Sequence, residues 1–280
     1  MNTQSVSSGS SAKRAISSPR PALATRPGGI GIARSGYQSI GADEFKYWRF
    51  CAWNGYIFMA VFVVFWGLMS HNCPPLSADL PASAIAEYFR ADRNWIRLGM
   101  VVSMTFVICY LIWAIAIARV MSKVVGKDSI LIDLQVWGAG LTVVPILISS
   151  SFWLTGAFRP DALPDSVLQM LYDMAWLLID LAYATTSVQM VAIGVAFLQD
   201  DREQPLVPKL LAWYGIWVAF SFAAECLMPF FKTNAFARDG LLNFWIEFPV
   251  WFVWAPTLTY YILKAIPRLE LEAREEAANA

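Results

Sequence analysis

Histidine is almost absent from this chain, because His71 is the only one in 280 residues. Di-iron sites, paired haem ligands and zinc held by three imidazoles each need several histidines, so none of these centres is expected. Cysteine is also scarce, and no C-x-x-C pair predicts a zinc site or a disulfide framework. The cysteines are Cys51, Cys73, Cys109 and Cys226. We therefore predict no metal site and no cofactor.

Charged residues make up only 15% of the sequence, below the ~25% that is usual for a protein with a water-facing surface. The chain is instead 58% apolar, with a mean hydropathy of +0.49. Tryptophan and phenylalanine are abundant, and aromatic side chains are favoured where a membrane meets water. This composition predicts an all-α integral membrane protein.

Six apolar stretches are each long enough to supply the ~20 residues that cross a bilayer core. We expect them to form a bundle of six transmembrane helices within residues 46–266. They lie near residues 50–70, 97–119, 131–154, 168–198, 210–231 and 241–264. Residues 1–45 are rich in Ser, Gly, Pro and Arg and predict a disordered basic tail, while residues 267–280 predict a polar tail.

The orientation of the bundle follows from lysine and arginine, which are enriched on the cytoplasmic side of membrane proteins. With the N-terminus inside, the inner and outer segments hold 15 and 6 of the 21 basic residues. This asymmetry predicts that both termini are cytoplasmic. In the first outer loop, residues 82–94 follow Pro74 and Pro75 and have an apolar face, which predicts a short amphipathic helix on the outer membrane surface.

Four carboxylates fall inside the predicted spans, where a charge costs at least ~2.5 to 3.5 kcal/mol. Asp173 and Asp180 lie on the fourth span, Glu225 on the fifth and Glu247 on the sixth. At about 1.5 Å per residue, Asp173, Glu225 and Glu247 are expected roughly 8 to 9 Å below the outer surface. Asp180 lies deeper on the face of Asp173, because seven residues is close to two helical turns. We therefore predict a layer of carboxylates in the outer half of the membrane.

Aromatic and polar residues follow the same helix faces as these acids. The stripe on the sixth span is Asn243, Glu247, Trp251 and Trp254, and that on the fourth is Asp173, Trp176, Asp180, Tyr183 and Ser187. The pattern predicts an outer-half cavity walled by indoles and floored by acids. Such a cavity can hold a cation over aromatic faces, or a flat apolar molecule with a polar end.

A purely structural interpretation of the acids stays open beside this one. Intramembrane carboxylates can pair with basic residues and clamp helices together. The basic residues near the outer boundary are Arg97, Arg159, Lys232 and Arg238. The distinction depends on whether the acids converge on an open cavity or each meet a cation.

The run from Leu227 to Trp245, with Asp173-Met-Ala-Trp176 upstream, resembles a group of bacterial multi-pass membrane proteins that have no assigned activity. The resemblance covers about the last 120 residues of the chain. It implies a protein of the bacterial cell inner membrane, and it transfers no functional residue.

Three functions are compatible with these observations. The first is binding or transport of a small lipophilic or cationic molecule at the cavity. The second is a membrane-embedded enzyme, such as an isomerase or cyclase of a lipid-like substrate, in which carboxylates act as general acid and base. The third is a structural subunit of a membrane complex. The expected partners are the lipid bilayer, a small ligand and another membrane protein or a second copy, with no nucleic acid.

Overall fold

The structure is a computed structural model that describes residues 35–279, with side chains from residue 44 onward. All regular secondary structure in the described chain is helical, and the described residues contain no strand. By length and composition, five of its helical segments can cross a membrane, as expected of a multi-pass α-helical membrane protein. These segments are Glu44–Met69, Arg93–Val125, Ile130–Phe158, Asp165–Leu198 and Lys209–Phe230.

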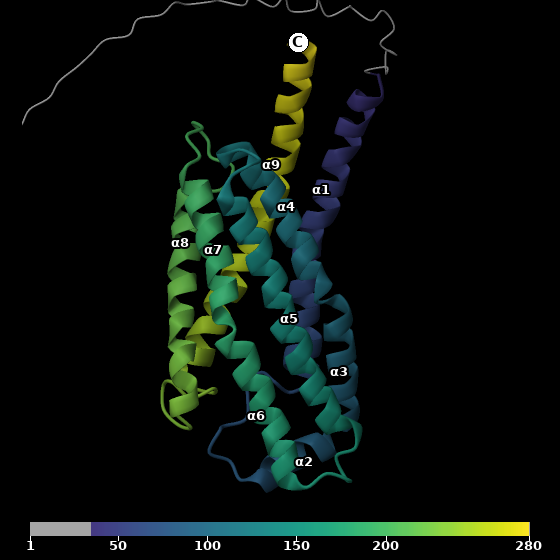
Figure 1. The fold of residues 1–280 in the computed structure, drawn as a ribbon, viewed down its shortest axis with the longest axis vertical. Coiled ribbons are helices and arrows are strands. Elements are labelled where there is room, and N and C mark those ends of the chain that lie inside the picture. The colour runs from purple at the N-terminus through teal and green to yellow at the C-terminus, as the bar shows by residue number, and fades with distance from the viewer. Residues whose placement is uncertain (1–34, 280) are drawn as a thin grey trace, which may run out of the picture.

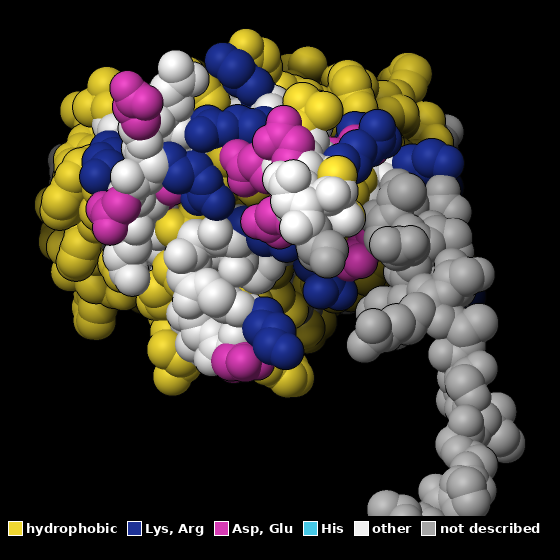
Figure 2. All heavy atoms as spheres, turned by 90° about the horizontal axis from the view of Figure 1, so that it is seen from above, with side chains coloured by type: hydrophobic (Ala, Val, Ile, Leu, Met, Phe, Trp, Pro, Cys, Tyr) yellow, Lys and Arg dark blue, Asp and Glu magenta, His cyan; other side chains and the backbone are white. Residues whose placement is uncertain are grey.

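The outer surface of the bundle is apolar, which fits contact with lipid and does not fit contact with water. Large apolar side chains are exposed on several helices, for example Trp137 at 70%, Phe220 at 70% and Val253 at 57%. The charged side chains gather at an end of the bundle, where Figure 2 shows lysines, arginines and acids inside a rim of apolar side chains.

The first half of the bundle is built from three long segments and one short helix. The elements are α1 (Ser35–Val61), which continues as the π-helix η1 (Phe62–Met69), α2 (Ala82–Ala91), α3 (Arg93–Phe106), α4 (Ile108–Val125) and α5 (Ile130–Phe158). Helix α1 already begins within the stretch predicted to be a disordered tail. The rest of that predicted tail, residues 1–34, lies outside the described residues.

Helix α2 falls in the first long loop, where a short amphipathic helix is predicted. Its apolar side chains include Ile85, Tyr88 and Phe89, and all three are buried within the protein. The ring of Tyr88 lies 5.4 Å from that of Tyr172 on the neighbouring helix α6. The apolar face of α2 is therefore covered by protein, and not presented to a membrane surface.

The second half of the bundle contains α6 (Asp165–Leu181), α7 (Tyr183–Leu198), α8 (Lys209–Ser221), the 3₁₀-helix η2 (Phe222–Phe230), the π-helix η3 (Leu241–Ile246) and α9 (Glu247–Asn279). Helix α9 packs beside α1 and α8. The start of α1 and the end of α9 lie at the same end of the bundle (Figure 1). The last segment is not one of the five counted above, and its many Trp, Tyr and Pro residues lower its mean hydropathy.

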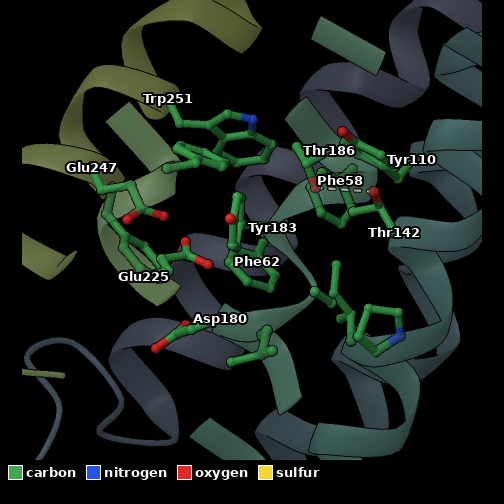
Figure 3. A pocket seen from close by; sticks show the side chains of 16 residues that line it. Phe58, Phe62, Tyr110, Thr142, Asp180, Tyr183, Thr186, Glu225, Glu247 and Trp251 are labelled. Atoms are coloured by element: carbon green, nitrogen blue, oxygen red, sulfur yellow. Dashed lines mark hydrogen bonds between the residues drawn. The ribbon is translucent and has the colours of Figure 1, made fainter. Parts of the chain in front are cut away.

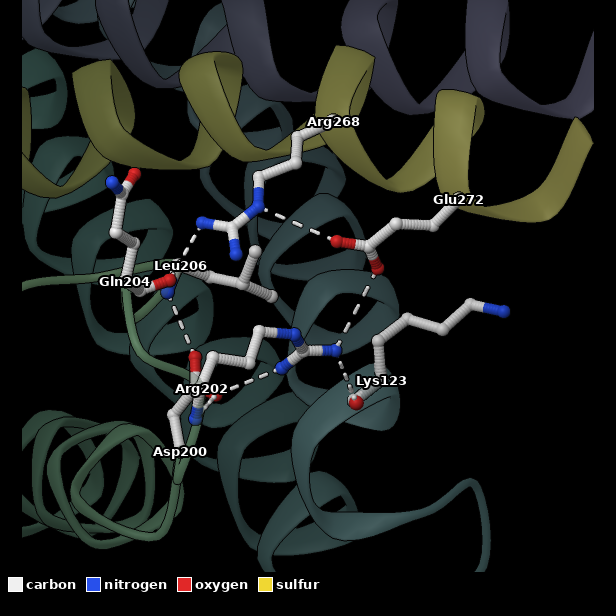
Figure 4. A network of polar contacts seen from close by, with 7 residues as sticks. All are labelled: Lys123, Asp200, Arg202, Gln204, Leu206, Arg268 and Glu272. Carbon is white, nitrogen blue, oxygen red and sulfur yellow. Dashed lines mark hydrogen bonds and ion pairs between the residues drawn. The ribbon is translucent and has the colours of Figure 1, made fainter. Parts of the chain in front are cut away.

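A polar network joins the connecting loops to α9 at the end of the bundle where α9 projects (Figures 1 and 4). Asp200 is 1% exposed and accepts hydrogen bonds from the backbone N–H of Leu206, at 2.7 Å, and from the Arg202 guanidinium, at 2.8 Å. Arg202 also donates to the Lys123 carbonyl at 3.1 Å and faces Glu272 at 3.9 Å. Each buried charge in this network has a partner, so the network fixes the loop after α7 against α4 and α9.

Candidate functional site

The long helical segments all become irregular at one level of the bundle. Helix α1 changes to a π-helix at Phe62, α6 and α7 meet at Ala182, and α8 changes to a 3₁₀-helix at Phe222. Pro145 interrupts the hydrogen bonding of α5, and the π-helix η3 becomes α-helical at Glu247. In the segment formed by α3 and α4, the break is at Val107, one turn from Tyr110. Helix irregularities of this kind often mark functional sites.

A cavity of about 90 Å³ lies at this level. Its lining includes a residue within one helical turn of each of these irregularities, so the backbone breaks surround it. The residues that line it are Phe58, Phe62, Tyr110, Thr142, Pro145, Ile146, Ile179, Asp180, Ala182, Tyr183, Thr186, Phe222, Glu225, Glu247, Phe248 and Trp251. The volume suits a compact ligand or a few water molecules, because one water occupies about 30 Å³ in the liquid.

Three carboxyl groups share one side of the cavity. Figure 3 shows the side chains of Glu225 and Glu247 directed toward each other, with Asp180 close by. Glu225 is 4% exposed, and Asp180 and Glu247 are each 3% exposed. Glu225 and Glu247 therefore present two carboxyl groups to the same side of the cavity.

These three acids have no cation of their own. Within the described part of the chain, none of them forms an ion pair, and the Oε2 atoms of Glu225 and Glu247 have no hydrogen-bond partner. Arg238 donates its hydrogen bonds to Leu76, Asp173 and Ser77 instead, so no guanidinium of the described residues is bound to the three acids that face the cavity.

Asp173 does not join the other acids, contrary to the predicted layer of Asp173, Glu225 and Glu247. Its carboxylate accepts a hydrogen bond from Arg238 at 2.5 Å, and its side chain is 42% exposed. Arg238 also donates to the carbonyls of Leu76, at 2.5 Å, and Ser77, at 3.0 Å. Asp173 and Arg238 thus form a structural clamp, as the alternative interpretation expects, while Asp180 takes the place of Asp173 in the cluster.

The aromatic and amide candidates are divided in the same way. Trp251 lines the cavity, but Trp176 packs against Trp66 with ring centroids 5.5 Å apart, in the aromatic core outside the cavity. Trp254 is buried against Trp113 at 6.2 Å. Asn243 is 1% exposed and donates to the Phe236 carbonyl at 2.7 Å, so it holds the backbone before η3 in place.

Several polar groups in or beside the cavity were not among the predicted site residues. Tyr110 donates a 2.6 Å hydrogen bond to the Gln189 side chain, and the hydroxyls of Thr142 and Thr186 are 3.0 Å apart. Figure 3 shows Tyr110, Thr142 and Thr186 together, across the cavity from the acids. Polar residues inside otherwise apolar spans were the available sequence signal, since such groups require a partner in lipid.

The arrangement suits a compact cation. The acids supply negative charge and hydrogen-bond acceptors, and the rings of Phe62, Tyr183 and Trp251 surround the same space, where an aromatic face can stabilise a cation. No cluster of three or more His, Cys, Asp or Glu within the described residues has the arrangement to hold a metal ion. No family model, curated protein or solved structure compared with the chain matches it.

Proposed function

We propose that this chain is a multi-pass membrane protein that binds a small cationic molecule in the carboxyl-lined cavity and carries it across the membrane. The ligand's positive charge faces Asp180, Glu225 and Glu247, and its apolar part packs on the surrounding aromatic rings. The observation that carries the proposal is a set of buried carboxyl groups that form no ion pair within residues 44–279 but border an open space. Such groups are costly inside a membrane protein unless something else compensates them.

The transport part of the proposal includes a sixth crossing formed by η3 and α9. Helix α9 supplies Glu247 and Trp251 to the cavity while exposing Val253 at 57% and Tyr260 at 54% on its outer side. A helix that is buried on one side and apolar on the other fits a position between the bundle and lipid. Six crossings also agree with the start of α1 and the end of α9 lying at one end (Figure 1). We place that end on the cytoplasmic side of a bacterial inner membrane.

Equilibrium binding of methylammonium to the purified full-length protein tests the binding site. Replacing a carboxylate by an amide keeps the shape but removes the charge, so Glu247→Gln and Asp180→Asn should each weaken binding at least about tenfold. Asp173→Asn is the matched control, because Asp173 lies on the same helix as Asp180 but is paired with Arg238 outside the cavity. This variant should bind methylammonium like the wild type.

Uptake of labelled methylammonium into proteoliposomes tests the transport part. Flux should require the protein and should fall in Glu247→Gln to the level of empty vesicles. Unchanged binding and unchanged flux in both cavity variants would remove the proposed site. Binding without any flux would instead reduce the protein to a membrane receptor for the cation.

A membrane-embedded acid/base enzyme is the second candidate, and one observation favours it. The carboxyl groups of Glu225 and Glu247 face each other at an aromatic-walled cavity, and such a pair can act as general acid and general base. An enzyme of this kind would return a bound unsaturated amine as an isomer. Recovery of such a ligand chemically unchanged after prolonged incubation, as judged by mass spectrometry and NMR, supports binding or transport over catalysis.

A further inference from the structure

A second cavity lies between η1 and the segment formed by η3 and α9. Its volume is about 250 Å³, larger than that of the carboxyl-lined cavity. Its walls are apolar and mostly aromatic, and they carry no charged side chain. The lining residues are Phe62, Val63, Trp66, Gly67, Leu68, Cys73, Phe244, Trp245, Phe248, Pro249 and Phe252. We call this space the apolar groove.

The apolar groove and the carboxyl-lined cavity are neighbours. The side chains of Phe62 and Phe248 line both cavities, so these two rings form part of the wall between them. Trp66 holds both rings from the groove side, with ring centroids 4.4 Å from Phe62 and 6.0 Å from Phe248. A polar, acidic chamber and an apolar chamber therefore share one aromatic wall.

The groove also borders the outer surface of the bundle. Val63 is 40% exposed, Leu68 57% and Trp245 53%, so one side of the groove is open where the surrounding surface is apolar. An apolar chain can thus enter the groove from the lipid without passing through water. The neighbouring acids provide charge complementarity for a positive group at the end of that chain.

Resting on the proposed function, we infer that the ligand is a cationic amphiphile, with a compact ammonium head in the carboxyl-lined cavity and a single apolar chain in the groove. The juxtaposition of the two cavities across Phe62 and Phe248 carries this assignment. A neutral lipid chain alone satisfies the groove but leaves the carboxyl groups uncompensated. A small cation alone satisfies the acids but leaves the larger space unused.

A series of alkylammonium ions, from methylammonium to decylammonium, tests the inference when binding to the wild type is compared with binding to Gly67→Leu. A Cβ atom at Gly67 would come no closer than 3.5 Å to Cys73 and 3.6 Å to the Phe62 carbonyl, so the backbone tolerates a side chain that fills the groove. We expect Gly67→Leu to weaken decylammonium binding about tenfold, the effect of displacing about two buried methylene groups. Methylammonium binding should be unchanged.

Long amines also partition into the detergent, but this partition lowers the apparent affinity of both proteins equally. It therefore cancels when the variant is compared with the wild type. Gly140→Leu is the matched control, since Gly140 lies on α5 away from both cavities and its Cβ would meet only Leu111, at 3.9 Å. Trp245→Ala is a second groove variant that removes an exposed wall residue and should also weaken only the long amines.

The outcomes separate the two proposals. If methylammonium binds and decylammonium binding ignores both groove variants, the amphiphile assignment is wrong and the cation site stands. If no amine binds at the acids, the proposed function is wrong. If uncharged 1-decanol binds the groove as tightly as decylammonium, and Glu247→Gln weakens neither, the groove holds ordinary bilayer lipid only and the assignment is also wrong.

Cys73 offers an independent measurement, because this free thiol lines the groove. In a variant that lacks the other three cysteines, bound decylammonium should slow the reaction of Cys73 with a maleimide at least about tenfold. Burial raises the pKa of the Cys73 thiol, so the labelling is performed at mildly alkaline pH. Methylammonium should not slow the reaction, and equal protection by both amines would contradict a chain in the groove.

Discussion

Two groups of buried carboxylates in this bundle have opposite surroundings. Asp200 is 1% exposed and is fully engaged by the Leu206 N–H and the Arg202 guanidinium. Glu225 and Glu247 are nearly as buried, yet each keeps one oxygen without a partner and faces a cavity. Similar burial therefore does not imply similar stabilisation of a carboxyl group. The difference is whether the protein itself supplies hydrogen-bond partners and a guanidinium.

Among the acids that have a cationic partner, we expect the largest loss of stability when the partner of Asp173 is removed by Arg238→Ala. This change removes a 5% exposed guanidinium that donates to two carbonyls and to Asp173. We expect the free energy of unfolding to fall by about 3 kcal/mol, at the low end for a broken buried pair because Asp173 is partly exposed. Unfolding in mixed micelles measures the change, with Lys232→Ala on the same loop as the control. A loss as small as that of the control would contradict the clamp.

A somewhat smaller loss is expected for Asp200→Asn at the other end of the bundle. The amide keeps the shape, but Arg202 loses its buried partner and the Leu206 N–H loses a charged acceptor. We expect a decrease of about 2 kcal/mol in the free energy of unfolding. Asp201→Asn changes an exposed neighbour and should have little effect. Equal effects at the two positions would show that the network does not stabilise the fold.

The same network predicts an acid-sensitive part of the stability. Burial alone would raise the pKa of Asp200, but the hydrogen bonds from Leu206 and Arg202 outweigh burial, and the pKa lies below its ordinary value of 3.8. A lowered pKa in the folded state stabilises the protein above the ordinary value, and this contribution is lost as the pH falls through the folded pKa. The difference in stability between wild type and Asp200→Asn should thus be constant from about pH 7 to pH 5 and shrink below about pH 4.

Glu225→Gln should have the opposite sign, which sharpens the comparison. The new amide can donate to Glu247 and removes one unpaired buried carboxyl group. We expect the free energy of unfolding to rise by about 1 kcal/mol while cation binding weakens. Glu203→Gln, at an exposed position, is the control. A clear loss of stability would mean that Glu225 is a structural residue.

The smallest effect is expected at the exposed ion pair between Arg93 and Asp161, whose charged atoms lie 2.8 Å apart. Because the side chains are 45% and 67% exposed, water and salt screen the attraction. Asp161→Asn should change the free energy of unfolding by less than about 0.5 kcal/mol. A larger effect would indicate that short distance, and not burial, decides the value of ion pairs in this protein.

The sequence identified much of the cavity but not its geometry. Asp180, Glu225, Glu247 and Trp251 were recognised because charges and aromatics inside apolar spans are unusual, and all four line the cavity. Asp173 is predicted to lie with them because its depth is counted along a straight α-helix. It instead pairs with Arg238, which comes from a loop whose path no helical periodicity predicts.

The irregular backbone explains much of the remaining difference. A 3₁₀-helix rises about 2.0 Å per residue and an α-helix 1.5 Å, so depths counted through η2 are displaced. The π-helices η1 and η3 rotate the following side chains relative to an α-helical stripe. These changes result from tertiary packing and are not encoded in the apolar pattern alone, so the separation of Asn243 from the cavity could not be predicted.

The plane of helix breaks around the cavity also bears on how the molecule can move. On the side where α1 begins and α9 ends, the long segments are α-helical, whereas on the other side three of them are formed by η1, η2 and η3. Sharp helix bends occur at prolines and at π-helical turns, so we expect any bending of the bundle to be easiest at that plane. Because the carboxyl-lined cavity lies at the same plane, such a bend would change the access to the acids without separating them widely.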